Sequence, residues 1–200
     1  WTVRTERPWR EREVANVDDA FKELYDRAGS ALILKDPNAG GDPDDYPLRF
    51  FKARPNDDWS GLNVPRTNGN KIYIVDWNET SDNANRSARR TVIHEMGHNW
   101  DSELEARHVP GNTLRDNYWE DFEDLHRDSE NINWEDLRDQ YRVNPSRTMD
   151  YARGYGAKNE DDDWCTCWEV ELGYTSRPSN ATAILDDKLA IVDEFFDMFA

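Results

Sequence analysis

Two histidines and a glutamate, spaced as His94, Glu95 and His98, are the residues of this chain whose types and spacing could do chemistry. On a helix, residues four apart project from one face, so both imidazoles could bind one tetrahedral Zn²⁺. Glu95 could reach a water on the metal without binding the metal itself. Gly97 leaves the helix slim beside the metal, where a substrate or another backbone could approach. The motif therefore predicts a zinc site with a general base.

The third protein ligand decides the class of zinc site, because catalytic sites use three protein ligands and a water. The class that continues the motif as HExxHxxGxxH is excluded, since Asp101 stands at its glycine position and Leu104 at its last histidine position. His108 lies just before a Pro-Gly turn and His126 is one of many polar residues on an expected helix, so both are expected at the surface. A carboxylate from a later helix is the better candidate.

The run HEMGHNWD at residues 94–101, followed by YGAKNEDDDW at residues 155–164, resembles the gluzincin-type zinc peptidases related to the catalytic domain of anthrax lethal factor. In that family the helix reads HExGHxxD, and a later segment reads approximately YxRTNxxE. The resemblance implies a zincin-like fold, Asp162 as the third zinc ligand, and Tyr155 as a residue that assists catalysis. This chain departs from the family in having Asp162 in place of the longer Glu, and Ala157 in place of Arg.

A rival third ligand comes from a second resemblance. The run TMDY at residues 148–151 is similar to part of the GTxDxxYG segment of aspzincin peptidases, whose Asp binds zinc, and it implies Asp150 as the ligand. Asp162 is the preferred ligand, and Asp150 stays open. The tyrosine that assists catalysis is likewise open between Tyr155 and Tyr151.

Together these residues predict a zinc-dependent endopeptidase that hydrolyses peptide bonds with a metal-activated water. Glu95 would take the proton of the water and deliver it to the departing amine. Tyr155 would donate a hydrogen bond to the oxyanion, or serve only as a core or turn tyrosine. Asp101 is expected to orient a histidine or to cap the helix. The alternative function is a zinc-retaining binding module without turnover, against which Glu95 argues.

The elements that must position these residues are those of an α+β, zincin-like metallopeptidase domain, with a small N-terminal β-sheet, the HExxH helix and a mainly helical C-terminal half. We expect one domain over residues 1–200, with 1–16 as an extended arm. Strands are expected at residues 31–34, 48–51 and 71–76, with loops at 36–47 and 56–70. Helices are expected at residues 16–29, 87–101, 114–128, 134–141, 162–172 and 180–199.

Composition and charge limit the partners of the chain. The sequence has 42 acidic and 25 basic residues, a net charge of -17, and so lacks the basic footprint that nucleic acid requires. The acidic run at residues 160–163 is expected to form a solvated face.

Cys165 and Cys167, two apart, are expected to be free thiols that cannot both face one metal ion. No apolar stretch is long enough to span a bilayer. We expect a monomer acting on peptides or proteins, with a secreted or extracellular location favoured.

Overall fold

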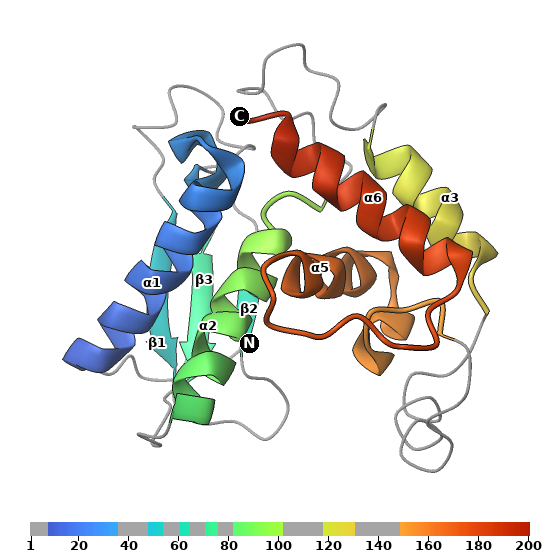
Figure 1. Cartoon of the computed structure of the whole chain (residues 1–200). Helices are drawn as coiled ribbons and strands as arrows, with labels where there is room; N and C mark the ends of the chain where they lie inside the picture. Colours follow the sequence, from blue (N-terminus) through green and yellow to red (C-terminus); the bar gives the residue numbers. More distant parts are fainter. Residues whose placement is uncertain are drawn as a thin grey trace.

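The computed structural model describes residues 8–35, 48–53, 61–64, 71–75, 82–101, 118–130 and 149–200. Helices dominate this part of the chain, and a small sheet lies on one side of them (Figure 1). The helical elements are α1 (Glu11–Ala28), the 3₁₀ helix η1 (Ala31–Leu34), α2 (Asp82–Gly97), α3 (Glu120–Asp128), the 3₁₀ helix η3 (Gly154–Lys158), α5 (Glu160–Glu171) and α6 (Ala183–Asp197). Among the described residues, no helix is both long enough and apolar enough to cross a membrane.

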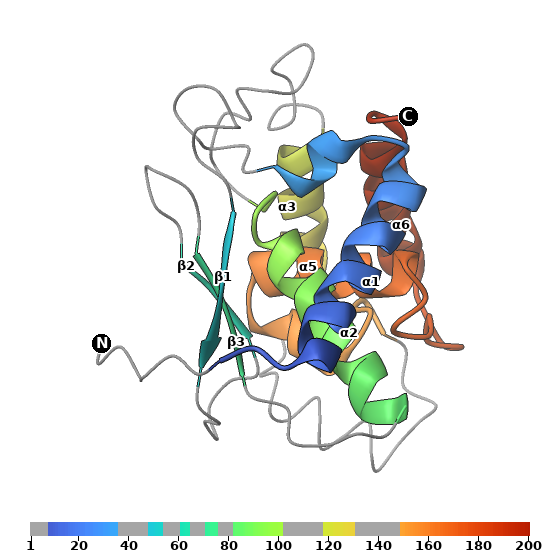
Figure 2. The same ribbon diagram turned by 90° about the vertical axis from the view of Figure 1, so that its left-hand side faces the viewer.

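The sheet contains three described strands in the order β1-β3-β2, namely β1 (Arg49–Ala53), β2 (Gly61–Val64) and β3 (Lys71–Val75). The central strand, β3, pairs parallel with β1 and antiparallel with β2. Because side chains alternate along a strand, Ile72 and Ile74 of β3 share one face, and both are buried. Helices α1 and α2 lie on one side of the sheet (Figure 2). The predicted strands at 48–51 and 71–76 are thereby confirmed.

Helix α1 is joined to β1 by an aromatic contact and by a buried ion pair. The rings of Phe21 and Phe50 meet edge to face, with centroids 5.3 Å apart. The ammonium of Lys52 lies 2.7 Å from Glu13 Oε2, and both side chains are almost fully buried. A buried pair of this kind must be complete, because either charge alone would be costly away from water.

Two predictions about the N-terminal elements were wrong. Helix α1 begins at Glu11 instead of near Asn16, so residues 11–16 are helical and not an extended arm. The early start is stabilised by Glu13, whose carboxylate accepts a hydrogen bond from the Arg10 amide at 2.8 Å. Residues 31–34, predicted as a strand, form η1, because Ser30 accepts a hydrogen bond from the amide of Leu32 and tightens the chain into a turn.

Strand β2 was also missed, because its four residues lie among Gly, Asn and Pro, which are typical of loops. In the motif helix, the helical segment starts at Asp82, five residues before the predicted start, and ends at Gly97. The predicted helix at 134–141 and the histidine His108 lie outside the described residues.

The C-terminal helices enclose an aromatic core. Trp164 of α5 lies with its ring centroid 5.1 Å from that of Phe122 on α3 and 5.2 Å from that of Phe195 on α6. Leu185 and Phe195 of α6 and Phe199, two residues after its end, are buried, which confirms the predicted packing role of that helix. The predicted helices at 162–172 and 180–199 are confirmed with small shifts of their ends. Within the predicted helix at 114–128, the described part begins at residue 118, and α3 spans Glu120–Asp128.

Half of the acidic run in the first turn of α5 is buried, although the run was predicted to be a solvated face. Asp162 is 2% exposed and Asp163 is fully buried. Asn159 caps this turn by accepting a hydrogen bond from the Asp162 amide at 2.7 Å. The acidic residues there are also favoured by the positive end of the helix dipole. The predicted free thiols are confirmed, since Cys165 and Cys167 are both unpaired and buried.

Candidate metal centre

The last turns of α2 bring the two motif histidines together. Val92, Ile93 and Met96 are fully buried, and this fixes which face of α2 is left for the histidines. His98 follows the last helical residue, but its amide still donates to the His94 carbonyl at 3.2 Å, so the spacing of one helical turn is retained. The two imidazole centroids are 5.0 Å apart.

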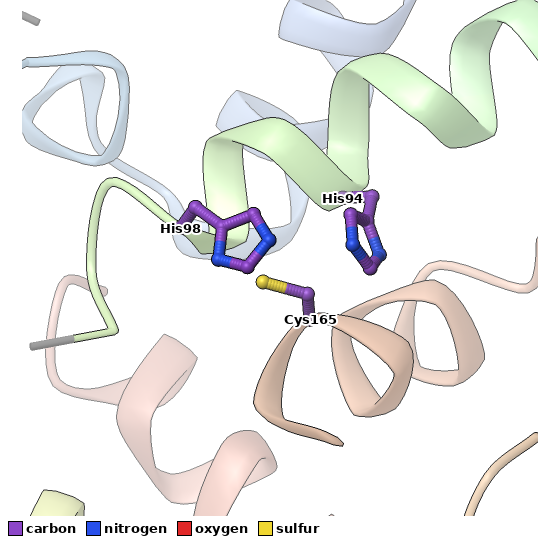
Figure 3. Close-up of side chains that lie close together, drawn as sticks. All are labelled: His94, His98 and Cys165. Carbon is purple, nitrogen blue, oxygen red and sulfur yellow. The ribbon is translucent and has the colours of Figure 1, made fainter. Parts of the chain in front are cut away.

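Helix α5 approaches α2 at Gly97. A methyl group at this position would lie 2.8 Å from Cys165 Sγ and 3.2 Å from Cys165 Cα, so only glycine permits this contact. Figure 3 shows the thiol of Cys165 directed from α5 towards the ring of His98 on α2. The predicted close approach of another backbone at Gly97 is therefore observed, and the approaching segment is α5.

Asp162 lies opposite the two histidines. Its Oδ1 atom is 3.3 Å from His94 Nε2 and 3.5 Å from His98 Nε2. Zinc binds histidine nitrogen and carboxylate oxygen at about 2.0–2.2 Å, so the ligand atoms of a tetrahedral site are separated by roughly 3.3–3.6 Å. The three donors therefore suit Zn²⁺ in type, and the two separations that involve Asp162 are those expected between ligands of a tetrahedral site.

The other nitrogen of each imidazole faces a carboxylate. His98 Nδ1 contacts Asp101 Oδ2, as expected for a residue that orients a histidine. His94 Nδ1 lies 3.0 Å from Glu169 Oε1, and Glu169 is held in place by Arg153 at 2.8 and 2.9 Å. A carboxylate at Nδ1 fixes the tautomer with the proton on Nδ1, which leaves the lone pair of Nε2 for a metal.

Glu169 and Asp162 remain ionised although they are buried, whereas burial raises the pKa of Asp101 to about 7. Burial would raise the pKa of Glu169, but its hydrogen bond with His94 and the charge of Arg153 lower it to about 2. Burial would likewise raise the pKa of Asp162, but its hydrogen bonds with His94 and His98 hold it well below its usual range. In return, the carboxylates raise the pKa of His94 despite the desolvation of its ring. Two ionised carboxylates, those of Asp162 and Glu169, therefore face the ring of His94 inside the buried site.

Glu95 and Tyr155, the two residues predicted to act in catalysis, flank the ligands. Glu95 follows His94 on α2 and is 4% exposed. Tyr155 lies on η3 with its ring centroid 5.6 Å from that of His94. Its hydroxyl accepts a hydrogen bond from Lys158 Nζ at 3.2 Å, so this bond does not use the proton of the phenol.

The rival ligand Asp150 takes part in a different set of contacts. Its carboxylate accepts hydrogen bonds from the Glu130 amide at 2.8 Å and from Thr182 Oγ1 at 2.6 Å. Tyr151, the rival tyrosine, donates to the Glu130 carbonyl at 3.0 Å. Both residues thus connect the segment after α3 with the start of α6.

His126, predicted to be a surface residue, belongs to a buried charge network. Its Nδ1 lies 2.8 Å from Asp163 Oδ2, and its side chain is only 17% exposed. The same oxygen lies 2.7 Å from Lys188 Nζ, and the side chains of Asp163 and Lys188 are fully buried. The surface prediction for His126 was therefore wrong, because α3 packs its histidine onto α5.

Cys165 and Cys167 were predicted not to bind a metal ion, and the structure corrects this prediction for Cys165. A ligand atom from each of His94, His98 and Cys165 lies within 4.8 Å of the other two, so these residues could hold a metal ion. The geometric argument still holds that two thiols at this spacing cannot share one ion. It does not prevent Cys165 alone from facing the histidines.

Glu169 was missed altogether, although the sequence held a signal for it. It lies seven residues after Asp162, so the two carboxylates share one face of α5 two turns apart.

Comparisons with known proteins bear on the fold. No protein-family model matches the chain, and no curated protein matches it. Among solved structures, the crystal structure of a "putative zinc-binding metallo-peptidase" from Bacteroides caccae is similar, with a TM-score of 0.54 and 13% sequence identity. The match covers 100% of this chain and 80% of that chain. The chain therefore has a metallopeptidase-like fold.

Proposed function

We propose that this chain is a zinc-dependent endopeptidase in which His94, His98 and Asp162 hold the metal. The observation that carries the proposal is the position of Asp162 Oδ1, 3.3 and 3.5 Å from the two Nε2 atoms. Support comes from the carboxylates at both Nδ1 atoms, which leave the lone pair of each Nε2 atom for a metal.

Zn²⁺ held by these residues would supply a Lewis acid that lowers the pKa of a water and polarises a carbonyl. Glu95 takes the proton of the attacking water and later delivers it to the departing amine. Tyr155, whose ring centroid lies 5.6 Å from that of His94, donates its phenolic proton to the oxygen of the tetrahedral state. Asp101 and Glu169 hold the two imidazoles in the tautomer that binds metal.

Two measurements on the full chain test the proposal. Metal analysis should find about one zinc per chain, and a peptide library should be cleaved in a chelator-sensitive way. Glu95→Gln should keep the zinc and lose activity by about 10²- to 10⁴-fold. Full activity in this variant would remove Glu95 from its role as the base.

The ligand choice needs its own comparison. Asp162→Ala should lose zinc, whereas Asp150→Ala should keep it and lose only stability, because Asp150 binds the Glu130 amide and Thr182. The reverse result would transfer the third ligand to Asp150.

A second candidate function, a zinc-retaining binding module without turnover, is favoured by one observation. Cys165 lies beside His94 and His98, and a thiolate in the fourth position would close the site, as in structural zinc sites. Cys165→Ala separates the two functions. The peptidase should keep its zinc and its activity, whereas a closed structural site should lose metal affinity. Cobalt substitution adds a direct readout, because thiolate ligation gives a sulfur-to-metal charge-transfer band.

A further inference from the structure

Lys158 contacts the one oxygen of Asp162 that does not face the histidines. Its Nζ atom lies 2.7 Å from Asp162 Oδ2, while Oδ1 of the same carboxylate points at the two Nε2 atoms. The carboxylate side chain is 4% exposed and the lysine side chain 41% exposed. The two oxygens of Asp162 therefore have separate partners, one on each side of the carboxylate.

The backbone that carries Lys158 is fixed against α5. Gly156 of η3 packs so closely that a methyl group there would lie 2.7 Å from Thr166 Oγ1 and 3.2 Å from Asp163 Cα. One residue after Lys158, Asn159 caps the first turn of α5 through the Asp162 amide. The lysine thus starts from a rigid position, and its contact with Asp162 bridges the extended residue Asn159 between η3 and α5.

Carboxylates bind metal ions through one oxygen or through both. On a zinc with three protein ligands, a second carboxylate oxygen would occupy the coordination position that a catalytic site leaves open for water. An ammonium group that holds Oδ2 opposes this, because the oxygen would have to give up a charge-assisted hydrogen bond before it could turn to the metal.

We propose that Lys158 is a positioning residue that keeps Asp162 bound to the metal through a single oxygen. The inference rests on the proposed function, since it needs a metal between His94, His98 and Asp162. The same ammonium lies 3.2 Å from the Tyr155 hydroxyl and 4.9 Å from the centroid of its ring. Lys158 therefore also holds Tyr155 beside the metal ligands, and one side chain sets the geometry of two functional groups.

The test compares Lys158→Met with the wild type, both loaded with Co²⁺ alone or with Zn²⁺ alone. If Lys158 keeps Asp162 monodentate, the variant should show weaker visible cobalt bands, as expected when the coordination number rises from four to five. X-ray absorption of the zinc form should show the same increase. The kcat for peptide cleavage should fall by about 10- to 100-fold with little change in KM.

Three further variants complete the design. Lys158→Gln repeats the loss of charge with a different side chain, which guards against a folding defect of the methionine variant. Lys158→Arg keeps a positive donor and should restore the wild-type spectrum. Lys22→Met is the matched control, because Lys22 and Asp26 form a Lys-Asp pair at the same spacing of four residues on α1.

The outcomes distinguish failure of this inference from failure of the proposed function. Unchanged cobalt and zinc spectra in both uncharged variants would overturn the role of Lys158, while the zinc site itself would stand. A wild-type protein that binds neither metal would overturn both. A spectral change in Lys22→Met equal to that in Lys158→Met would show a general effect of lost charge and would also overturn the inference.

Discussion

Replacing Lys188 with methionine should destabilise the fold strongly. The Nζ atom of Lys188 lies 2.7 Å from Asp163 Oδ2 and donates to Ser129 Oγ at 2.6 Å and to the Asp150 carbonyl at 3.0 Å. An ammonium has three protons, so these contacts use all of its donors. Methionine fills most of the same volume but supplies no donor, and three acceptors would lose a partner at once.

The size of the effect follows from the burial of the pair. The side chains of Lys188 and Asp163 are both fully buried. Removing one partner of a buried ion pair costs about 3–5 kcal/mol, because the remaining charge has no water to replace the lost contact. In a chain of this size, 1 kcal/mol lowers Tm by roughly 2–4 °C, so Tm should fall by about 6–20 °C.

Thermal and urea unfolding, followed by circular dichroism, would measure this loss. The double variant Asp163→Asn with Lys188→Met should cost less than the sum of the two single changes, because the asparagine leaves no unpaired charge. Lys22→Met serves as the control, since its pair with Asp26 is exposed and its loss should leave Tm nearly unchanged. Strict additivity in the double variant, or a loss of less than about 1 kcal/mol in Lys188→Met, would refute the argument from buried charge.

Further predictions concern the contact between α2 and α5. Gly97→Ala places a methyl group 2.8 Å from Cys165 Sγ, so it should cost about 1–3 kcal/mol in unfolding free energy and weaken zinc binding. Adding Cys165→Ala should restore part of the lost stability and part of the lost zinc affinity. A double variant that is as unstable as Gly97→Ala and binds zinc as weakly would contradict the steric explanation. Glu169→Gln should lower zinc affinity about 10- to 100-fold in a chelator competition, because His94 loses its charged partner. Glu171→Gln, on the same helix but paired with Arg27, is its control, and equal losses in both variants would count against a specific role for Glu169.

Several elements of the fold were predictable because their signals are local. The β-branched and aromatic content of Lys71–Val75 identified a strand, and Gly29, with a φ of 67°, ends α1 where the sequence indicated. Residues 31–34 misled, because a short apolar run fits a strand and a buried turn equally well. Ser30 favours the turn, because its hydroxyl accepts a hydrogen bond from the amide of Leu32.

In the candidate site as well, some residues could be predicted from local spacing and others could not. His94 and His98 were readable from their spacing, and Asp101 lies only three residues beyond His98. Glu169 lies 75 residues from its partner His94, so its role depends on how α5 docks on α2. Cys165 depends on the same docking. The spacing of Glu169 from Asp162 indicates a shared face of α5, but that this face meets the histidines is set by the packing of the two helices at Gly97.

The two imidazoles also differ in which part of the fold must form before each ring is oriented. The partner of His98 comes from the same chain turn, three residues away, whereas the partners of His94 lie 68 and 75 residues away on α5. A local opening that lifts α5 from α2 would therefore remove Asp162 and Glu169 together while leaving His98 and Asp101 intact. If zinc binds as proposed, its release should report the detachment of one helix and should precede global unfolding on heating. In this protein, metal exchange and hydrogen exchange of α5 should follow the same opening reaction.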